Sequence, residues 1–204
     1  MYEVEVKVPA DHEAVRERLR AAGAAVGDRV AQEDTYFDAP HREFVETDEA
    51  LRVRRFAAAA PTFERDGAAV GPLVETILDG DGGEAATSEV TYKGPLVDAA
   101  SKTREEFETG VGDGDAMREI LVRLGFEPAA TVRKLREHYS MAGLTVSLDA
   151  VEGVGEYVEV ETEVETEDEV GPAREEAYAV LRELDLDPTE QVQTSYLGLA
   201  LEDA

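Results

Sequence analysis

Charged and apolar residues alternate along several short segments of this chain, beginning at its first residues. Residues 2–8 read Tyr-Glu-Val-Glu-Val-Lys-Val, with Glu3, Glu5 and Lys7 on one side of an extended backbone and valines on the other. A period of two predicts a β-strand, because successive side chains of a strand point to opposite faces. The chain must therefore build a sheet with one apolar face and one densely charged face.

The same alternation returns on later segments with acidic or basic pairs two residues apart. The pairs are Arg52/Arg54, Glu106/Glu108, Lys134/Arg136 and Glu159/Glu161, and Lys93 and Arg104 are single basic residues on strand faces. Each pair lies on one side of its strand. Cross-strand salt bridges on a solvated sheet would explain any one pair. The recurrence on successive strands favours a closed antiparallel barrel with a charged lumen.

Turn residues divide the chain into strands and helices of ordinary length. Asp11 can cap a helix that Gly23 ends, and Pro172 suits the first turn of another helix. We predict helices over 11–22, 115–124, 172–184 and 190–200, and strands over 2–8, 26–37, 51–56, 89–93, 103–109, 126–139, 142–150 and 156–166. Residues 57–86, rich in Ala, Gly, Pro and Asp, predict a loop insertion with a short strand near 73–78. The sequence thus predicts an α+β fold in a single domain over 1–204.

The order of the first segments is echoed in the second half of the chain. A strand with charged residues on one face, a helix and a long strand follow one another from Glu3 and again from Arg104. Any α+β chain contains such units, so an internal repeat is one of two explanations. If the repeat is real, the two halves of one sheet face each other across a charged interior.

Composition excludes several classes of function. The chain has 47 Asp and Glu against 20 Lys and Arg, a net charge of −27, which repels nucleic-acid backbones. It has no cysteine and no apolar run long enough for a transmembrane helix, so we expect a cytoplasmic protein without disulfides or thiolate metal sites. Sixteen Arg against four Lys, together with the acidic excess, are typical of a halophilic source, where salt screens the repulsion.

A lumen with both signs of charge suits one class of ligand. Carboxylates supply the hard oxygen ligands that Mg²⁺ and Mn²⁺ prefer, and arginine binds phosphate oxygens through its planar fork. In a chain of net charge −27, a tetra-anionic polyphosphate needs such a local concentration of cations. Two other motifs do not indicate a site. The three histidines are too far apart for a helical zinc motif, and Gly153-Val154-Gly155 lacks the flanking residues of a phosphate-binding loop.

These motifs together resemble the CYTH family, which is named for class IV adenylyl cyclases and thiamine triphosphatases and belongs to the triphosphate tunnel metalloenzymes. Glu3-x-Glu5-x-Lys7 is similar to the ExExK signature of that family. Further matches follow in family order: Gln32–Phe37, Ala50–Arg54, Thr91–Pro95, Arg104–Glu106, Lys134–Arg136, Leu148–Glu161 and, near the C-terminus, Ser195–Leu197. Residues Gln32–Arg42 resemble the cyclase branch in particular.

The resemblance implies a closed eight-stranded antiparallel β-barrel with helices packed outside, which holds a triphosphate together with Mg²⁺ or Mn²⁺. It implies metal ligands or metal-proximal carboxylates at Glu3, Glu5, Glu106, Glu108, Glu159 and Glu161. It implies phosphate-binding residues at Lys7, Arg52, Arg54, Lys93, Arg104, Lys134 and Arg136. We expect Glu3, Glu5, Lys93 and the lumen carboxylate Asp149 to be catalytic.

Three functions remain open from the sequence. A cyclase would convert ATP to cyclic AMP and pyrophosphate, with the ribose 3′-hydroxyl attacking the α-phosphorus. A hydrolase would cleave tripolyphosphate or thiamine triphosphate, and a non-catalytic module would only bind a polyphosphate or a nucleotide. The cyclase-like stretch Gln32–Arg42 favours the first, with ATP as the expected substrate, and the sequence leaves a homodimer open.

Overall fold

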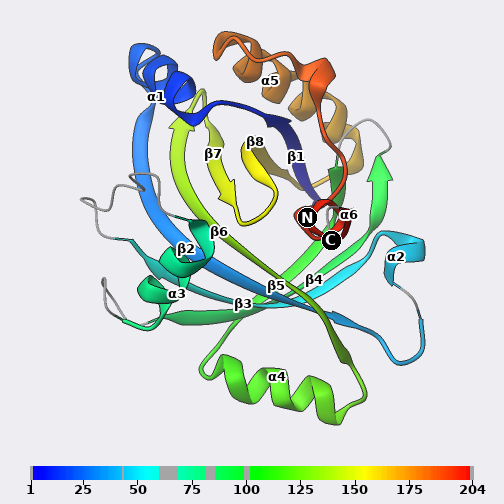
Figure 1. The fold of residues 1–204 in the computed structure, drawn as a ribbon. Helices are drawn as coiled ribbons and strands as arrows, with labels where there is room; N and C mark the ends of the chain where they lie inside the picture. Colours follow the sequence, from blue (N-terminus) through cyan, green and yellow to red (C-terminus); the bar gives the residue numbers. More distant parts are fainter. Residues whose placement is uncertain (1, 43, 60–68, 81–85, 99–101, 203–204) are drawn as a thin grey trace.

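The computed structural model describes residues 2–42, 44–59, 69–80, 86–98 and 102–202 of the 204-residue chain. The strands are β1 (Tyr2–Pro9), β2 (Ala25–Asp38), β3 (Ala50–Ala58), β4 (Thr87–Asp98), β5 (Lys102–Val111), β6 (Glu127–Met141), β7 (Leu144–Val151) and β8 (Gly155–Val164). Within the described residues, these eight antiparallel strands close into a barrel in the order β1-β5-β4-β3-β2-β6-β7-β8 (Figure 1). The predicted α+β barrel is confirmed.

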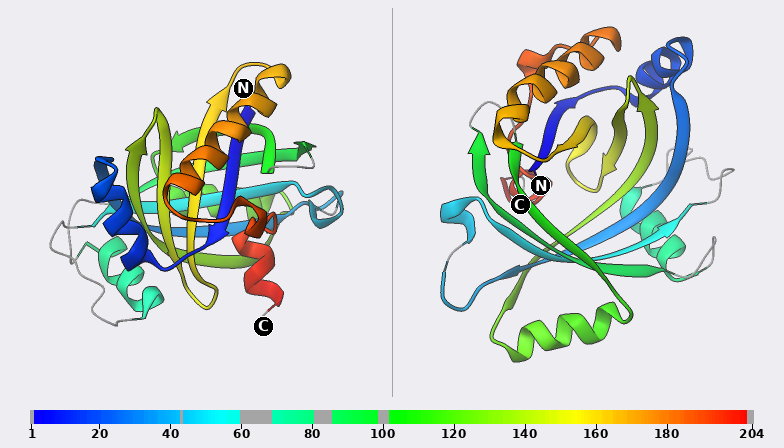
Figure 2. Two further views of the ribbon diagram at one scale, coloured as in Figure 1. Left: turned by 90° about the horizontal axis from the view of Figure 1, so that it is seen from above. Right: turned by 180° about the vertical axis from the view of Figure 1, so that it is seen from behind.

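Helices pack around the outside of the barrel. They are α1 (His12–Ala21), α2 (Phe44–Thr47), α3 (Val70–Leu78), α4 (Gly114–Arg123), α5 (Val170–Glu183) and α6 (Tyr196–Glu202), with 3-10 turns η1 (Glu167–Glu169) and η2 (Pro188–Glu190). Helices α1 and α5 lie near one another on one side of the barrel, and α4 lies across the opposite side (Figures 1 and 2). In the part of the chain that is described, no helix has the length and apolar character that a membrane span requires.

The apolar core lies between the barrel and these helices rather than inside the barrel. Val6 and Val8 of β1 point outward and pack with Leu19 of α1 and Leu181 of α5, all of them buried. Their neighbour Lys7 points inward and is only 2% exposed. Strand alternation therefore buries both faces of β1, the apolar face under helices and the charged face in the lumen.

Exchanging the two halves of the chain leaves the strand order unchanged. Strand β1 pairs with β5 and β2 pairs with β6, while β3 and β7, and β4 and β8, occupy equivalent places in the closed order. Helices α1 and α4 each follow the first strand of their half. The echo in the sequence thus corresponds to a twofold repeat in topology, with the two halves facing each other across the lumen.

Two predicted elements are wrong. The short strand expected near 73–78 is part of α3, where Val70, Val74 and Ile77 recur at helical spacing on the buried side. Pro72 stands in the first turn, where its missing N–H costs nothing. Residues 60–68 and 81–85 of the predicted insertion lie outside the described residues.

The helix expected over 190–200 begins only at Tyr196. The backbone N–H of Val192 donates to the carbonyl of Lys7 at 2.8 Å, so the segment before the helix follows β1 in a non-helical conformation. Ser195 then accepts from the N–H of Gly198 at 3.0 Å through its side chain and starts α6 as a helix cap. The sequence pattern did not reveal this tertiary contact.

Candidate functional site

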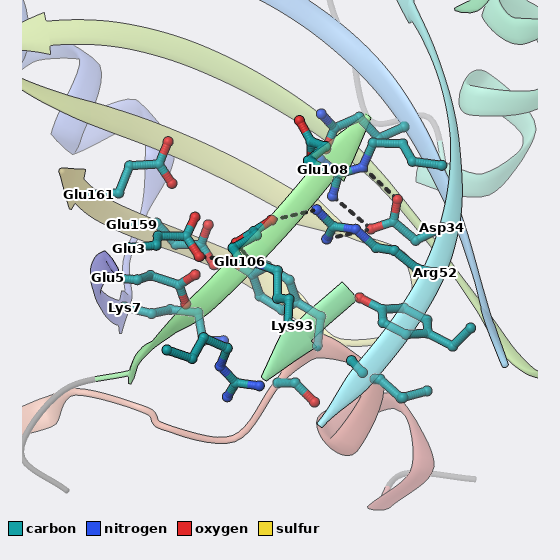
Figure 3. Close-up of a pocket in the computed structure, with 18 of the residues that line it drawn as sticks. Glu3, Glu5, Lys7, Asp34, Arg52, Lys93, Glu106, Glu108, Glu159 and Glu161 are labelled. Carbon is teal, nitrogen blue, oxygen red and sulfur yellow. Dashed lines mark hydrogen bonds and ion pairs between the residues drawn. The ribbon is translucent and has the colours of Figure 1, made fainter. Parts of the chain in front are cut away.

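A cavity of about 590 Å³ occupies the barrel interior. It is lined by every residue predicted for the site except Asp149. Figure 3 shows the carboxylates of β1 and β8 on one side of the cavity, Arg52 and Asp34 on the other, and Lys93 and Glu106 between them. Closure of the sheet therefore brings together side chains more than 150 positions apart in the chain.

On the side opposite the carboxylates of β1 and β8, Asp34 of β2 holds two arginines of β3. Its carboxylate accepts from Nε and Nη2 of Arg54 at 2.6 and 2.8 Å, and from Nη1 of Arg52 at 3.3 Å. Burial alone would raise the pKa of Asp34, but the charges of Arg54 and Arg52 outweigh it and hold the pKa well below its usual range. Asp34 stays ionised and orients both guanidinium groups.

Asp149 of β7 plays the same structural part for two cations of β6. Its carboxylate accepts from Nζ of Lys134 at 2.9 Å and from Nε of Arg136 at 2.6 Å. Burial acts against ionisation here too, and the charges of Arg136 and Lys134 overcome it and lower the pKa of Asp149. Arg136 also binds Glu159 on β8. Because Asp149 is fully buried behind these cations, it positions them and does not itself line the cavity.

We call this side the basic wall and define it as Asp34, Arg52, Arg54, Lys134, Arg136 and Asp149. The acidic wall is formed by Glu3, Glu5, Glu106, Glu108, Glu159 and Glu161 on β8, β1 and β5, which are neighbours in the barrel. The cross-strand register places Glu5 opposite Glu161 and Lys7 opposite Glu159. The two walls therefore gather opposite charges on different sectors of one barrel.

Crowding of like charges perturbs the acidic wall. The pKa of Glu161 is raised to about 7, first by burial and then by repulsion from Glu3, Glu159 and Glu5, against the attraction of Arg136. The described cations therefore leave Glu161 poorly compensated, whereas Lys93 and Arg52 lower the pKa of Glu106 on the same wall although burial would raise it. The wall is consequently an attractive place for an added cation.

Lys93 lies on β4, and Arg104 and Glu108 lie on the neighbouring strand β5. Lys93 Nζ lies 2.8 Å from Glu3 and 2.7 Å from Glu106, and these carboxylates raise its pKa although burial alone would lower it. Arg104 donates to the backbone and side-chain oxygens of Asp48 at 2.6 and 2.9 Å, so it ties the turn after α2 to the barrel. Glu108 accepts from Thr91 at 3.0 Å and is the most exposed member of the acidic wall.

The donor set of the acidic wall fits a hard divalent cation. Carboxylate oxygens are the ligands that Mg²⁺ and Mn²⁺ prefer, and the mutual repulsion around Glu161 would be relieved by such an ion. No three His, Asp or Glu residues converge in a ready metal-binding geometry among the residues that the structure describes. Glu3, Glu5, Glu159 and Glu161 are the side chains that would hold the ion.

Several lining residues belong to segments that matched the family but were not predicted as site residues. Asp34 and its neighbours Gln32 and Tyr36 share one face of β2, and Tyr196 enters the cavity from α6. The i, i+2 spacing of Gln32, Asp34 and Tyr36 was a usable signal, because it is the spacing that identified the other lumen faces. Nothing local could have placed Tyr196, whose position depends on the path of the C-terminal segment.

Comparisons with known proteins agree with this geometry. A sequence profile of the CYTH domain matches residues 1–196. A Methanocaldococcus jannaschii protein named as a candidate adenylate cyclase is 36% identical over 200 residues, which cover 98% of each chain. The solved structure of a Pyrococcus horikoshii protein has a TM-score of 0.81 and 35% identity over 99% of each chain. A Hippeastrum candidate adenylyl cyclase, described as having a dominant triphosphatase activity, shares the fold with a TM-score of 0.61 and 16% identity, over 98% of this chain and 95% of that one.

Proposed function

The chain belongs to the CYTH family, and from that membership we propose that it is a divalent-metal-dependent adenylyl cyclase, which converts ATP to cyclic AMP and pyrophosphate. The observation that carries the proposal is the pair of walls of opposite charge around one cavity. A triphosphate between them has cationic side chains for its oxygens on one side and carboxylates for its metal ions on the other.

The charge of the lining supports a ligand that arrives with cations. Eleven carboxylates and seven Lys or Arg side chains are among the described residues that line the cavity. This net negative lining would repel a tetra-anionic triphosphate alone, whereas bound divalent cations would offset the charge of the triphosphate and reduce the repulsion. A module that only binds phosphate needs fewer carboxylates, so this excess favours an enzyme.

The side chains divide the work between binding and charge stabilisation. Arg52, Arg54 and Arg136 would bind phosphate oxygens through planar guanidinium groups that Asp34 and Asp149 already orient. Lys93 would stabilise negative charge that develops on the phosphates in the transition state. A divalent cation held by the acidic wall would add Lewis-acid stabilisation of the same charge.

A triphosphatase is the second candidate. Of the described lining residues, most are charged and only Tyr36, Phe107, Tyr196 and His138 carry rings, so the cavity holds far more groups for phosphate than for a nucleobase. The Hippeastrum candidate adenylyl cyclase, which has the same fold, is described as having a dominant triphosphatase activity. The Methanocaldococcus relative, which is 36% identical over 98% of this chain, is named as a candidate adenylate cyclase and supports the first candidate.

One incubation separates these functions. The protein is mixed with ATP, tripolyphosphate or thiamine triphosphate, each with Mg²⁺ or Mn²⁺ in molar KCl, and the products are identified by chromatography. We expect cyclic AMP and pyrophosphate from ATP, a yield that Lys93→Ala abolishes and that Arg29→Ala, on the outer face beside Glu137, leaves unchanged. Orthophosphate alone, with tripolyphosphate consumed faster than ATP, would assign the protein as a hydrolase.

We also propose that the protein is a single cytoplasmic domain over 1–204 adapted to high salt. The support is the charge of −27, which strong screening would make tolerable. The melting temperature should fall between molar KCl and ~0.1 M KCl, and an unchanged value would refute the adaptation. Sedimentation in the same buffers decides between a monomer and a homodimer.

A further inference from the structure

The C-terminal segment closes one end of the cavity. Helix α6 lies against one end of the barrel (Figure 2), and Ser195, Tyr196 and Leu197 line the cavity there. Tyr196 packs with Tyr36, Val132 and Val151 in an apolar cluster that fills this end. A ligand that reaches this end therefore meets a wall and not an exit.

Tyr196 offers an unused hydrogen-bond donor at the closed end. The residue is 7% exposed, and its hydroxyl oxygen is buried without a hydrogen-bond partner in the described part of the chain. Burial, followed by the charges of Asp149 and Glu159, raises the pKa of Tyr196, so the hydroxyl keeps its proton. Buried polar groups are normally satisfied, and an unsatisfied hydroxyl on a residue that lines a cavity is available to a ligand bound there.

Two ammonium groups face the ring of the same tyrosine. Lys7 Nζ is 4.1 Å and Lys134 Nζ is 5.1 Å from the ring centroid, within the range of cation–π interactions. Lys134 is paired with Asp149. Lys7, only 2% exposed, donates to the carbonyl of Thr194 at 2.8 Å, and no carboxylate among the described residues is within 4.0 Å of it. A buried cation with so little compensation favours an anion beside it.

We propose that the closed end binds the terminal phosphoryl group of the triphosphate and that Tyr196 donates a hydrogen bond to it. This inference rests on the proposed function and adds to it the orientation of the triphosphate in the cavity. A terminal phosphoryl group carries more negative charge than an internal one, and here it would meet Lys7, Lys134 and a neutral donor. The rest of the substrate then extends away from α6, so the substrate class is a triphosphate whose terminal phosphoryl group is free.

Binding measurements with one hydroxyl removed test the proposal. Tyr196→Phe keeps the ring under Lys7 and Lys134 and removes only the donor, and thermal melting checks that the variant is folded. Calorimetry with tripolyphosphate and with ATP, in Ca²⁺ to slow turnover, should show affinities weakened about tenfold, as for a hydrogen bond to a charged group. The matched control is Tyr178→Phe on α5, outside the barrel, which should bind as the wild type does.

A second ligand tests the proposed orientation of the triphosphate. ATP esterified on its terminal phosphoryl group should bind the wild-type protein at least ~10-fold more weakly than ATP, and Tyr196→Phe should narrow this difference. Equal affinities of wild type and Tyr196→Phe for ATP, or of ATP and its ester for the wild type, would overturn the inference while the proposed function stands. A wild-type protein that binds neither ATP nor tripolyphosphate would overturn both.

Discussion

The basic wall and the acidic wall both bury carboxylates, but they balance them differently. Asp34 contacts two arginines, and Asp149 contacts a lysine and an arginine, so each carboxylate of the basic wall has more cations than it needs. Glu161 lies among like charges and retains a proton to about pH 7. The basic wall is therefore organised before any ligand binds, whereas on the acidic wall Glu161 lacks the compensation that an added cation would supply.

The internal repeat makes this difference informative. Strands β2 and β6 are equivalent under exchange of the two halves, as are β3 and β7. Yet Asp34 lies on β2 with its cations on β3, while Asp149 lies on β7 with its cations on β6. Both halves thus build one carboxylate between two cations, with the positions of acid and base exchanged. The fold places the two strands of each pair side by side. The carboxylate can lie on either strand of the pair, with its cations on the other, and the ion pairs still form.

The largest effect should come from breaking the basic wall. Asp149→Asn leaves the shape intact but removes the counterion of buried Lys134 and Arg136, and we expect unfolding to become easier by about 3–5 kcal/mol. Urea denaturation in molar KCl measures the loss. Asp115→Asn, at an exposed pair on α4, is the control and should change stability by less than ~1 kcal/mol. Equal stabilities of the two variants would refute the contrast between the walls.

Breaking the acidic wall should affect turnover instead. Glu5→Gln removes one negative charge from the wall that attracts the metal ion, and we expect turnover to fall on the order of 10²-fold, about 2.7 kcal/mol in the barrier. Titration calorimetry with Mn²⁺ should show weaker metal binding in the same variant. Glu165→Gln, at an exposed position beyond β8, serves as the control. Wild-type activity of Glu5→Gln at all metal concentrations would exclude this wall from the metal site.

The two walls should also respond to pH in opposite directions. Glu161 has a raised pKa of about 7 against an ordinary 4.5. Between these two pH values, the folded metal-free protein therefore keeps a proton on Glu161 that the unfolded chain has lost. Its contribution to stability is full below pH 4.5 and is lost as the pH rises to about 7. Asp34 and Asp149 have lowered pKa values, so their contribution is present above the ordinary value of 3.8 and is lost as the pH falls.

Unfolding free energies between pH 4.5 and pH 7, measured with a chelator, isolate the first effect. The difference between wild type and Glu161→Gln should change by roughly 2 kcal/mol across this range, because glutamine does not titrate. If that difference is independent of pH, Glu161 is an ordinary carboxylate and the acidic wall is already balanced.

The smallest effect should come from removing one phosphate contact. Arg54→Ala should weaken triphosphate binding by about tenfold, or ~1.5 kcal/mol, because it removes one charge-assisted contact and leaves Arg52 and Arg136 in place. Calorimetry compares it with Arg29→Ala, which lies on the outer face and should bind normally. Equal affinities of the two variants would count against phosphate binding by the basic wall.

The sequence by itself determined which side chains share one face of each strand. Alternation is a local property, because the period of two follows from the backbone of each strand, and it placed Glu3, Glu5 and Lys7 on one face before any partner strand was known. The motif order also led to the CYTH family. In α3 the helical spacing of the apolar residues was obscured by the turn-forming residues Gly71 and Pro72. The prediction of a short strand near 73–78 was therefore wrong.

Tertiary structure alone decided the partners. Asp34 meets Arg54 because β2 and β3 pair in that register, and Asp149 meets Arg136 because β6 and β7 do. The ring of Tyr196 contacts Lys7 because the C-terminal segment runs beside β1, although the two segments lie at opposite ends of the sequence. These contacts depend on the relative placement of separate strands, and that placement is set by closing the barrel and packing its outer face, not by any one segment.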